Sequence, residues 1–368
     1  MRILILNWRD IEHPLAGGAE LSLLKHAEYW HGQGAEITWF ASSFKGAATE
    51  QAQDGMRVVR RGSHYTVHFW AWLYYATARL GDYDIIVDSF HFLPFFSPLY
   101  ARGKRIVGLI NEVARDVWHD NMPFPLSTIG YYAEAFFFRP YRKRHFIAGS
   151  RSAKDDVAGL GIPADQITVV HHGTSAPRNP PPVARCEAPT ILFLNRVSED
   201  KGIRATLETY RQLKGEIPGL NLWIAGKEER TGMLHELLNE YGLTDGENVT
   251  YFGFVSEEEK YRLIAEAWLL LHPSKREGWG LTVIEAAAFG TPTVGFEVAG
   301  LRDSVQNGVT GILATDQQGM VAAVRDLLGD PEKRAALGEN CKPWSQRFDW
   351  TVAGTESWRV LNDEIAST

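Results

Sequence analysis

Short apolar runs typical of buried strands alternate along most of this chain with longer amphipathic stretches typical of helices. In the first half, the apolar runs predict strands at residues 3–7, 36–41, 57–60, 84–88, 105–110, 144–148 and 167–170. In the second half, they predict strands at residues 190–194, 220–225, 248–251, 268–271 and 292–295. This alternation predicts an α/β fold in which helices cover both faces of parallel sheets.

The stretches between these runs predict the helices. In the first half we expect helices at about residues 18–33, 68–80, 92–101, 127–142 and 151–159. In the second half we expect them at about residues 203–214, 231–241, 256–267, 282–289, 302–307, 317–328, 331–347 and 351–365.

A polar segment without periodicity, residues 173–189, separates the two halves. Its three consecutive prolines, Pro180 to Pro182, favour a stiff and extended join. Because 368 residues exceed what one core usually supports, we expect two domains. The predicted boundaries place one Rossmann-like domain at residues 1–172 and a second at residues 190–347.

Composition narrows the class of protein. Hydrophobic residues make up 45% of the chain and charged residues 23%, as in ordinary globular proteins, and the formal net charge of -7 argues against general nucleic-acid binding. The two cysteines, Cys186 and Cys341, lack metal-ligand spacing and fit a reducing compartment. No apolar run has the length of a signal peptide or a membrane span, so we expect a cytoplasmic protein.

Residues 272–296 contain two carboxylates on either side of a glycine-rich turn. Glu277 precedes the sequence Gly-Trp-Gly-Leu-Thr, and Glu285 lies in the alanine-rich helix that follows it. A glycine turn that leads into a helix presents backbone N–H groups and the positive end of the helix dipole, which suit a diphosphate. An alternative is a capping box, because Thr282 and Glu285 have the Thr-x-x-Glu spacing. That alternative leaves Glu277 and Trp279 unexplained.

A second motif, residues 192–202, places two cations at the end of a strand. Arg196 follows the apolar run at residues 190–194, and Lys201 lies just before the next helix. Ligands of parallel α/β sheets bind at the carboxyl ends of strands, and arginine and lysine both bind phosphate oxygens. The alternative is a solvated loop in which Arg196 pairs with Glu199, a surface contact of little energetic value.

The motif at residues 192–202 lies upstream of the motif at residues 272–296. In that order along the chain, the two motifs resemble the signature of retaining glycosyltransferases of family 4. The resemblance is strong in residues 190–310 and looser in residues 1–172. It implies the GT-B fold, with two doubly wound Rossmann-like parallel-sheet domains facing each other across a cleft. It also implies that the final helix, within residues 348–368, crosses back onto the first domain.

The resemblance gives each candidate a role. Arg196 and Lys201 would bind the donor diphosphate, Glu277 the hydroxyls of the donor sugar, and Glu285 the ribose hydroxyls. The backbone at the start of the helix would contribute further donors to the diphosphate, and the loop near residues 253–255 would select the base. The remaining donor-binding candidates in these two regions are Val255, Gly280, Leu281 and Thr282.

The first half matches the family less closely. Gly17 and Gly18 lie where the family has a glycine pair near the diphosphate, and they do not form the glycine fingerprint of nicotinamide-dependent oxidoreductases. Many family members have a histidine where this chain has Asn111, which cannot carry a proton at neutral pH. His91 is a candidate substitute. Residues 171–173 resemble a turn of the family, and without a third ligand they do not predict a metal site.

The resemblance implies transfer of a sugar, with retention, from a nucleotide diphosphate sugar (UDP or GDP most readily) to an acceptor hydroxyl. The acceptor would be a glycan, a lipid-linked glycan or a small glycoside in polysaccharide or natural-product biosynthesis. No Asp-x-Asp stands where a metal-dependent enzyme has one, so we expect no metal and no further cofactor. The alternatives are a GT-B nucleotide-sugar epimerase and a non-catalytic nucleotide-sugar-binding protein.

Residues 136–145 combine three phenylalanines with four basic residues. Such a helix suits peripheral contact with the inner face of a membrane. The interpretation we favour from the sequence is that the phenylalanines are buried in the core and the cations stabilise the helix end. The sequence does not predict an oligomeric state.

Overall fold

The computed structural model describes residues 1–77, 83–91, 93–115, 118 and 123–367, and it divides into two compact units. The first unit comprises Met1–Gly173 and Trp350–Thr368, and the second comprises Thr174–Asp349. The proline-containing segment expected as a linker therefore groups with the second unit, apart from Gly173. No helix in the described part of the chain is both long and apolar enough to cross a membrane.

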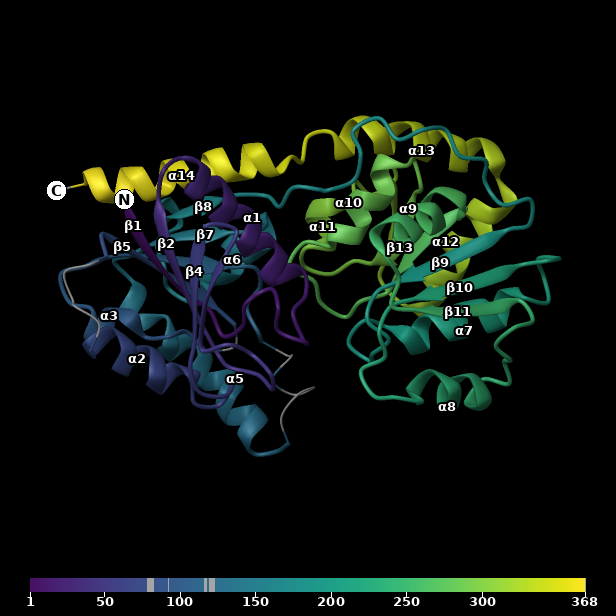
Figure 1. The fold of residues 1–368 in the computed structure, drawn as a ribbon. Coiled ribbons are helices and arrows are strands. Elements are labelled where there is room, and N and C mark those ends of the chain that lie inside the picture. Colours follow the sequence, from purple (N-terminus) through teal and green to yellow (C-terminus); the bar gives the residue numbers. More distant parts are fainter. Residues whose placement is uncertain (78–82, 92, 116–117, 119–122, 368) are drawn as a thin grey trace. The chain divides into compact units, whose positions relative to one another are not determined.

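The first unit contains an eight-stranded sheet in the order β3-β4-β2-β1-β5-β6-β7-β8 (Figure 1). Its strands are β1 Arg2–Leu6, β2 Glu36–Ala41, β3 Glu50–Gln53, β4 Met56–Arg60, β5 Ile85–Phe90, β6 Arg105–Ile110, β7 His145–Ala148 and β8 Ile167–Val169. All neighbouring strands are parallel except β3, which pairs antiparallel with β4. The sequence did not predict β3, because its residues, EQAQ, are mostly polar and lie at the edge of the sheet.

Alternate residues of β1 enter two different cores, which is why its apolar run has no polar positions. Leu4 and Leu6 face a core shared with the helices of one side, and Ile3 and Ile5 face a core on the other. The first side carries α2 Val67–Thr77, α3 Ser97–Tyr100, α5 Leu126–Phe137, the 3-10 helix η1 Arg139–Tyr141 and α6 Arg151–Gly159. The opposite side carries α1 Gly18–Gly32 and α14 Trp350–Ala366.

The last helix, α14, packs closely along α1. A Cβ at Gly354 would lie 2.3 Å from the ring of Tyr29, so this contact requires glycine. Ser357 accepts a hydrogen bond of 2.9 Å from Trp30 Nε1, and His26 Nδ1 lies 2.9 Å from the same hydroxyl. The final residues of the chain are thus part of the first unit.

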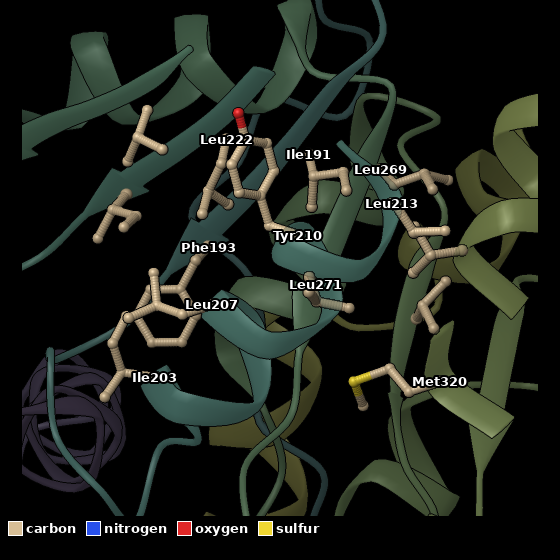
Figure 2. Packing of buried hydrophobic residues seen from close by; sticks show 14 of the residues in the cluster. Ile191, Phe193, Ile203, Leu207, Tyr210, Leu213, Leu222, Leu269, Leu271 and Met320 are labelled. Atoms are coloured by element: carbon tan, nitrogen blue, oxygen red, sulfur yellow. The ribbon is translucent and has the colours of Figure 1, made fainter. Parts of the chain in front are cut away.

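The second unit contains a six-stranded, fully parallel sheet in the order β11-β10-β9-β12-β13-β14. Its strands are β9 Thr190–Leu194, β10 Asn221–Ala225, β11 Val249–Gly253, β12 Leu269–His272, β13 Thr293–Phe296 and β14 Gly311–Ala314. Its helices are α7 Ile203–Leu213, α8 Met233–Glu240, α9 Glu257–Glu266, α10 Leu281–Ala288, α11 Leu301–Ser304, α12 Gln317–Gly329 and α13 Pro331–Ser345. Figure 2 shows Phe193 of β9 among Ile203 and Leu207 of α7 in the larger core of this unit.

Two predicted helices of the first unit are shorter than expected. The predicted helix at residues 92–101 is helical only in α3, because Asp88 accepts the backbone N–H groups of Phe95 and Ser97 and holds the preceding residues as a loop. The predicted helix at residues 127–142 is interrupted after Phe137 and continues only as η1. Residue 92, and residues 78–80 of the predicted helix at 68–80, lie outside the described residues.

The interpretation of residues 136–138 as core is right for one phenylalanine and wrong for another. Phe138 is 2% exposed and belongs to the core between the sheet and η1, whereas Phe136 is 55% exposed. The difference follows from helical geometry, because Phe136 lies on the side of α5 that faces away from the sheet. The exposed side of α5 is therefore apolar.

Candidate functional site

The candidate site of the second unit lies where the strand order reverses. β9 and β12 are neighbours, and the chain continues from β9 toward β10 on one side and from β12 toward β13 on the other. The loops that follow β9 and β12 therefore leave the sheet at the same edge, which is the usual ligand position of doubly wound sheets. These loops carry Lys201 and Glu277.

Close backbone contact holds the two loops together. Gly202 has φ +78°, and a Cβ there would lie 2.0 Å from the carbonyl oxygen of Pro273. Lys275 N–H donates to the carbonyl oxygen of Asp200 at 2.9 Å. A side chain at residue 202 would separate the loops, so this glycine is required for the approach of Lys201 to Glu277.

Three side chains converge on one oxygen of Glu277. Its Oε1 accepts from Lys201 Nζ at 2.8 Å and from Ser274 Oγ at 2.8 Å, and His272 Nε2 lies 3.1 Å away. The Glu277 side chain is 12% exposed. Burial opposes its ionisation, but the charge of Lys201 and the hydrogen bonds from His272 and Lys201 outweigh burial and hold the pKa of Glu277 well below its usual value. The carboxylate is thus ionised, and the described contacts leave its Oε2 for a further donor.

His272 connects Glu277 to the start of α10. Its ring is buried, and its second nitrogen, Nδ1, lies 3.3 Å from the hydroxyl of Thr282. An ionised carboxylate only accepts hydrogen bonds, so Nε2 donates to Glu277, and the contact of Nδ1 with Thr282 fixes the orientation of the ring. His272 therefore orients the carboxylate of Glu277.

The first turn of α10 presents backbone N–H groups. Gly280 is the N-cap with φ +88°, and no side chain caps the helix. The helix begins at Leu281, so Thr282 is not the cap, and the alternative of a Thr282–Glu285 capping box is wrong. The N–H groups of Leu281 and Thr282 lie in the first turn, where helices bind anions.

Glu285 lies one turn further along α10 and pairs with a residue that the motifs did not identify. Lys260 Nζ on α9 donates to Glu285 Oε1 at 2.7 Å and to Glu257 at 2.9 Å. Burial raises the pKa of Glu285, and the charge of Lys260 opposes that rise. Val255 lies in the loop just before α9 and packs against the smaller core of this unit. The candidates for the ribose and base contacts thus lie on neighbouring elements.

Arg196 has a different partner from the one the sequence indicated. Its Nη2 donates to Asp200 at 3.0 Å, while Glu199 pairs with Arg204 at 2.8 Å, so the alternative of an Arg196–Glu199 pair is wrong. The Arg196 side chain is 53% exposed. The structure brings Lys201 to Glu277 and directs Arg196 to Asp200.

The candidates of the first unit lie after β1, β5 and β6. Gly17 is the N-cap of α1, and its N–H donates to the buried Glu20 at 2.8 Å. Gly18 is the first residue of that helix. His91 stacks on Trp8 with ring centroids 4.5 Å apart. Burial lowers the pKa of His91, which favours a neutral ring.

Asn111 lies beside a histidine with a structural role. A Cβ at Gly149 would lie 2.5 Å from His172 Nε2 and 3.3 Å from Asn111 Oδ1, so both side chains border this glycine. His172 Nδ1 and Ser22 Oγ share a hydrogen bond of 2.6 Å. Burial lowers the pKa of His172 to about 3. Within the described ranges, no group of three or more His, Cys, Asp and Glu side chains could hold a metal ion.

Sequence reasoning missed His272, Ser274, Asp200 and Lys260. Ser274 and His272 lie inside the glutamate motif, and their value as donors appears only when both reach the same oxygen of Glu277. Lys260 follows three consecutive glutamates, so the sequence indicates only a solvated helix start. Its contact with Glu285 joins residues 25 positions apart.

Known proteins match both halves of the chain. Residues 16–176 match the family model of Glycosyltransferase Family 4, and residues 180–344 match that of Glycosyl transferases group 1. The glycogen synthase of Mycobacterium tuberculosis is 30% identical over 223 residues, which cover 58% of this chain and 53% of that protein. The match thus spans about half the length of this relative.

A GDP-mannose-dependent alpha-(1-6)-phosphatidylinositol monomannoside mannosyltransferase of Mycolicibacterium smegmatis is 26% identical over 359 residues, covering 89% of this chain and 90% of that protein. The structure of sucrose-phosphate synthase from Thermosynechococcus elongatus matches with a TM-score of 0.80 at 18% identity and covers 100% of both chains. This likeness, together with the two predominantly parallel sheets, confirms the predicted GT-B fold class.

Proposed function

Since the chain belongs to the group 1 glycosyltransferases of family 4, we propose that it transfers a sugar from a nucleoside diphosphate sugar to an acceptor hydroxyl. The observation that carries this proposal is the hydrogen bond of 2.8 Å between Lys201 and Glu277 at the switch point of the second sheet. It keeps a cation and an ionised carboxylate together close to the first turn of α10. A donor that carries both a diphosphate and sugar hydroxyls needs these two kinds of group.

The chemical requirement is departure of a nucleoside diphosphate while positive charge develops at the anomeric carbon. Preorganised donors directed at the growing negative charge are usually the largest catalytic contribution. Lys201 and Arg196 would offset that charge, together with the N–H groups of Leu281 and Thr282. Oε2 of Glu277 would accept hydrogen bonds from hydroxyls of the donor sugar, while His272 and Ser274 act as positioning residues for this carboxylate.

The finer features of the donor belong to the same proposal. Glu285 would accept hydrogen bonds from the ribose, with Lys260 holding its other oxygen, and Val255 would lie near the base. UDP and GDP sugars both remain candidates, and the name of the mycobacterial mannosyltransferase supports GDP. Retention at the anomeric carbon rests on the family, and metal independence rests on the two cations near the diphosphate.

The residues of the first unit keep the roles that the family resemblance predicts for them. Gly17 and Gly18 would approach the diphosphate from the first unit, and Asn111 or His91 would hold the reacting sugar. A neutral His91 suits a hydrogen-bonding role. The acceptor would be a glycan, a lipid-linked glycan or a small glycoside, in a protein that we expect in the cytoplasm.

The test is transfer assayed with a panel of UDP and GDP sugars in the presence of candidate acceptors. Wild-type protein should release the nucleoside diphosphate and glycosylate an acceptor, and Arg196→Ala should lower kcat by about 10²–10³ because it removes charge stabilisation of the leaving group. Arg204→Ala is the matched control, since Arg204 is also exposed and paired with carboxylates. If Arg196→Ala raises only KM, its leaving-group role is wrong. Interconversion of the free nucleotide sugar, or binding without turnover, would favour the epimerase or the binding protein instead.

A further inference from the structure

The first unit exposes an apolar face on α2. Tyr65, just before the helix, and Phe69 and Trp72 within it are spaced by four and three residues and therefore lie on one side. The opposite side of α2 is buried against the sheet through Val67 and Ala71. The helix contains no charged residue. A contiguous apolar face on a surface helix normally marks a site of contact with another protein or with a membrane.

Helix α5 repeats this arrangement. Its exposed apolar residues are Leu126, Ile129, Tyr132 and Phe136, spaced by three, three and four residues. Its other side is held close to the protein, because a Cβ at Gly130 would lie 2.3 Å from the ring of Trp118. The apolar side of α5 is thus its outer side.

Helix α3 contacts both α2 and α5 through aromatic rings. Tyr75 of α2 and Tyr100 of α3 have ring centroids 5.5 Å apart, and Phe96, the N-cap of α3, meets Phe137 of α5 at 5.8 Å. Figure 1 shows all three helices on the same side of the first sheet, opposite α14. We call their exposed apolar residues the aromatic face: Tyr65, Phe69, Trp72, Leu99, Leu126, Ile129, Tyr132 and Phe136.

Cations border the aromatic face at the end of α5. Arg139, Arg142 and Lys143 are exposed, and the guanidinium of Arg139 lies 4.0 Å from the ring centroid of Phe136. In residues 61–77, 97–105 and 123–145, which contain α2, α3, α5 and η1, the sequence contains one carboxylate, Glu134. It is buried and accepts the N–H groups of Ala114 and Arg115. These segments are therefore cationic in a chain whose formal net charge is -7, whereas α6 on the same side of the sheet carries Asp155 and Asp156.

We propose that the aromatic face docks the protein on an anionic lipid bilayer. Exposed Trp, Tyr and Phe side chains with flanking Arg and Lys are the combination that binds at the boundary between lipid head groups and acyl chains. The cations would attract acidic head groups, and the aromatic rings would enter the interface. The inference is independent of the proposed transferase activity, because it rests on the first unit alone and requires no donor.

The test is co-sedimentation of the full chain with vesicles of phosphatidylcholine alone and of phosphatidylcholine mixed with phosphatidylglycerol. Wild-type protein should bind the mixed vesicles at least about tenfold more strongly, because each cation near an anionic surface contributes to binding. The double variant Ile129→Ser/Phe136→Ser should lose at least about tenfold in binding to the mixed vesicles, because it removes apolar groups that enter the interface. Both residues are exposed, so the fold should persist.

Two control variants away from the aromatic face test whether the change in vesicle binding is specific to that face. Val352→Ser changes a 50% exposed residue on α14, on the other side of the sheet, and should bind like the wild type. Arg142→Glu/Lys143→Glu should abolish the preference for anionic vesicles, whereas Lys214→Glu, an exposed change in the second unit, should retain it. The proposal would be overturned if the wild type did not bind vesicles or bound both types equally. It would also be overturned if the Ile129/Phe136 variant bound the mixed vesicles as strongly as the wild type. A dimer in solution that this variant dissociates would overturn it too, because the face would then join two copies of the chain.

Discussion

At the scale of single residues, Glu277 is notable because it is ionised although it is largely buried. Burial alone would raise the pKa of its carboxyl group, and Lys201 and His272 together reverse that effect. All three donors, Lys201, His272 and Ser274, reach Oε1, so the described contacts leave Oε2 for a further donor. The carboxylate is preorganised before any donor binds, which is the property that electrostatic catalysis requires.

His272→Leu should lower kcat/KM by about tenfold or more, because it removes the donor that orients Glu277. His272→Gln should restore part of the loss, since its amide can still donate a hydrogen bond. Steady-state kinetics with the donor, alongside thermal melting, would check this. If both variants lose the same activity, or neither loses any, His272 fills space and does not position the carboxylate.

At the scale of elements, the packing around α1 and α14 buries two histidines, His26 of α1 and His172 of the loop after β8, and these make the first unit sensitive to acid. Burial lowers the pKa of His26 to about 4 and that of His172 to about 3, from an ordinary value of 6.5. Below pH 6.5 the unfolded chain binds protons at these rings that the folded chain does not. Stability is therefore complete above pH 6.5 and is lost as the pH falls toward the folded values.

The expected slope is about 1.4 kcal/mol per pH unit for each histidine between these limits. His26→Gln should keep a hydrogen bond to Ser357 and remove the contribution of one ring. Urea unfolding at several pH values between 7 and 5 should show a shallower acid dependence for this variant than for the wild type. An unchanged slope would mean that His26 is already protonated in the folded protein or stays neutral in the unfolded one.

The loops after β9 and β12 depend on a glycine. Gly202→Ala should destabilise the protein by clearly more than the ~1–2 kcal/mol that a left-handed backbone costs an alanine, because its Cβ would also collide with Pro273. Gly219→Ala is the matched control: its φ is +71°, but a Cβ there would meet only Ala188 at 4.0 Å. Urea unfolding of both variants gives the comparison. Similar losses would show that the loops can separate without cost.

Much of the fold could be predicted because buried parallel strands are apolar along most of their length, as β1 is after Arg2 and β9 after Thr190. The strand β14 was missed because it is short and begins with a glycine, Gly311. The structure requires a glycine there, since a Cβ would lie 2.2 Å from the carbonyl oxygen of Thr293. The site was predicted in part. Lys201 and Glu277 were identified separately, but their hydrogen bond joins residues 76 positions apart, and no local pattern encodes it.

At the scale of the whole molecule, the family assignment covers both halves of the chain, and one organised site lies in the second unit. The proposed chemistry assigns charge stabilisation to side chains and to a helix start. Turnover should therefore survive EDTA, because Lys201, Arg196 and the N–H groups of α10 take the part that a divalent ion has in metal-dependent transferases. Loss of activity in EDTA that magnesium or manganese restores would contradict this assignment.

The central claim is that the Lys201–Glu277 pair and the first turn of α10 receive the diphosphate and the sugar of the donor. The most direct measurement is an experimental structure of the protein with a bound UDP or GDP sugar. Diphosphate oxygens should lie within about 3 Å of Lys201 Nζ and of the N–H groups of Leu281 and Thr282, with a sugar hydroxyl on Glu277 Oε2. A donor bound elsewhere, with the contact between Lys201 and Glu277 intact and no ligand atom near it, would contradict the claim.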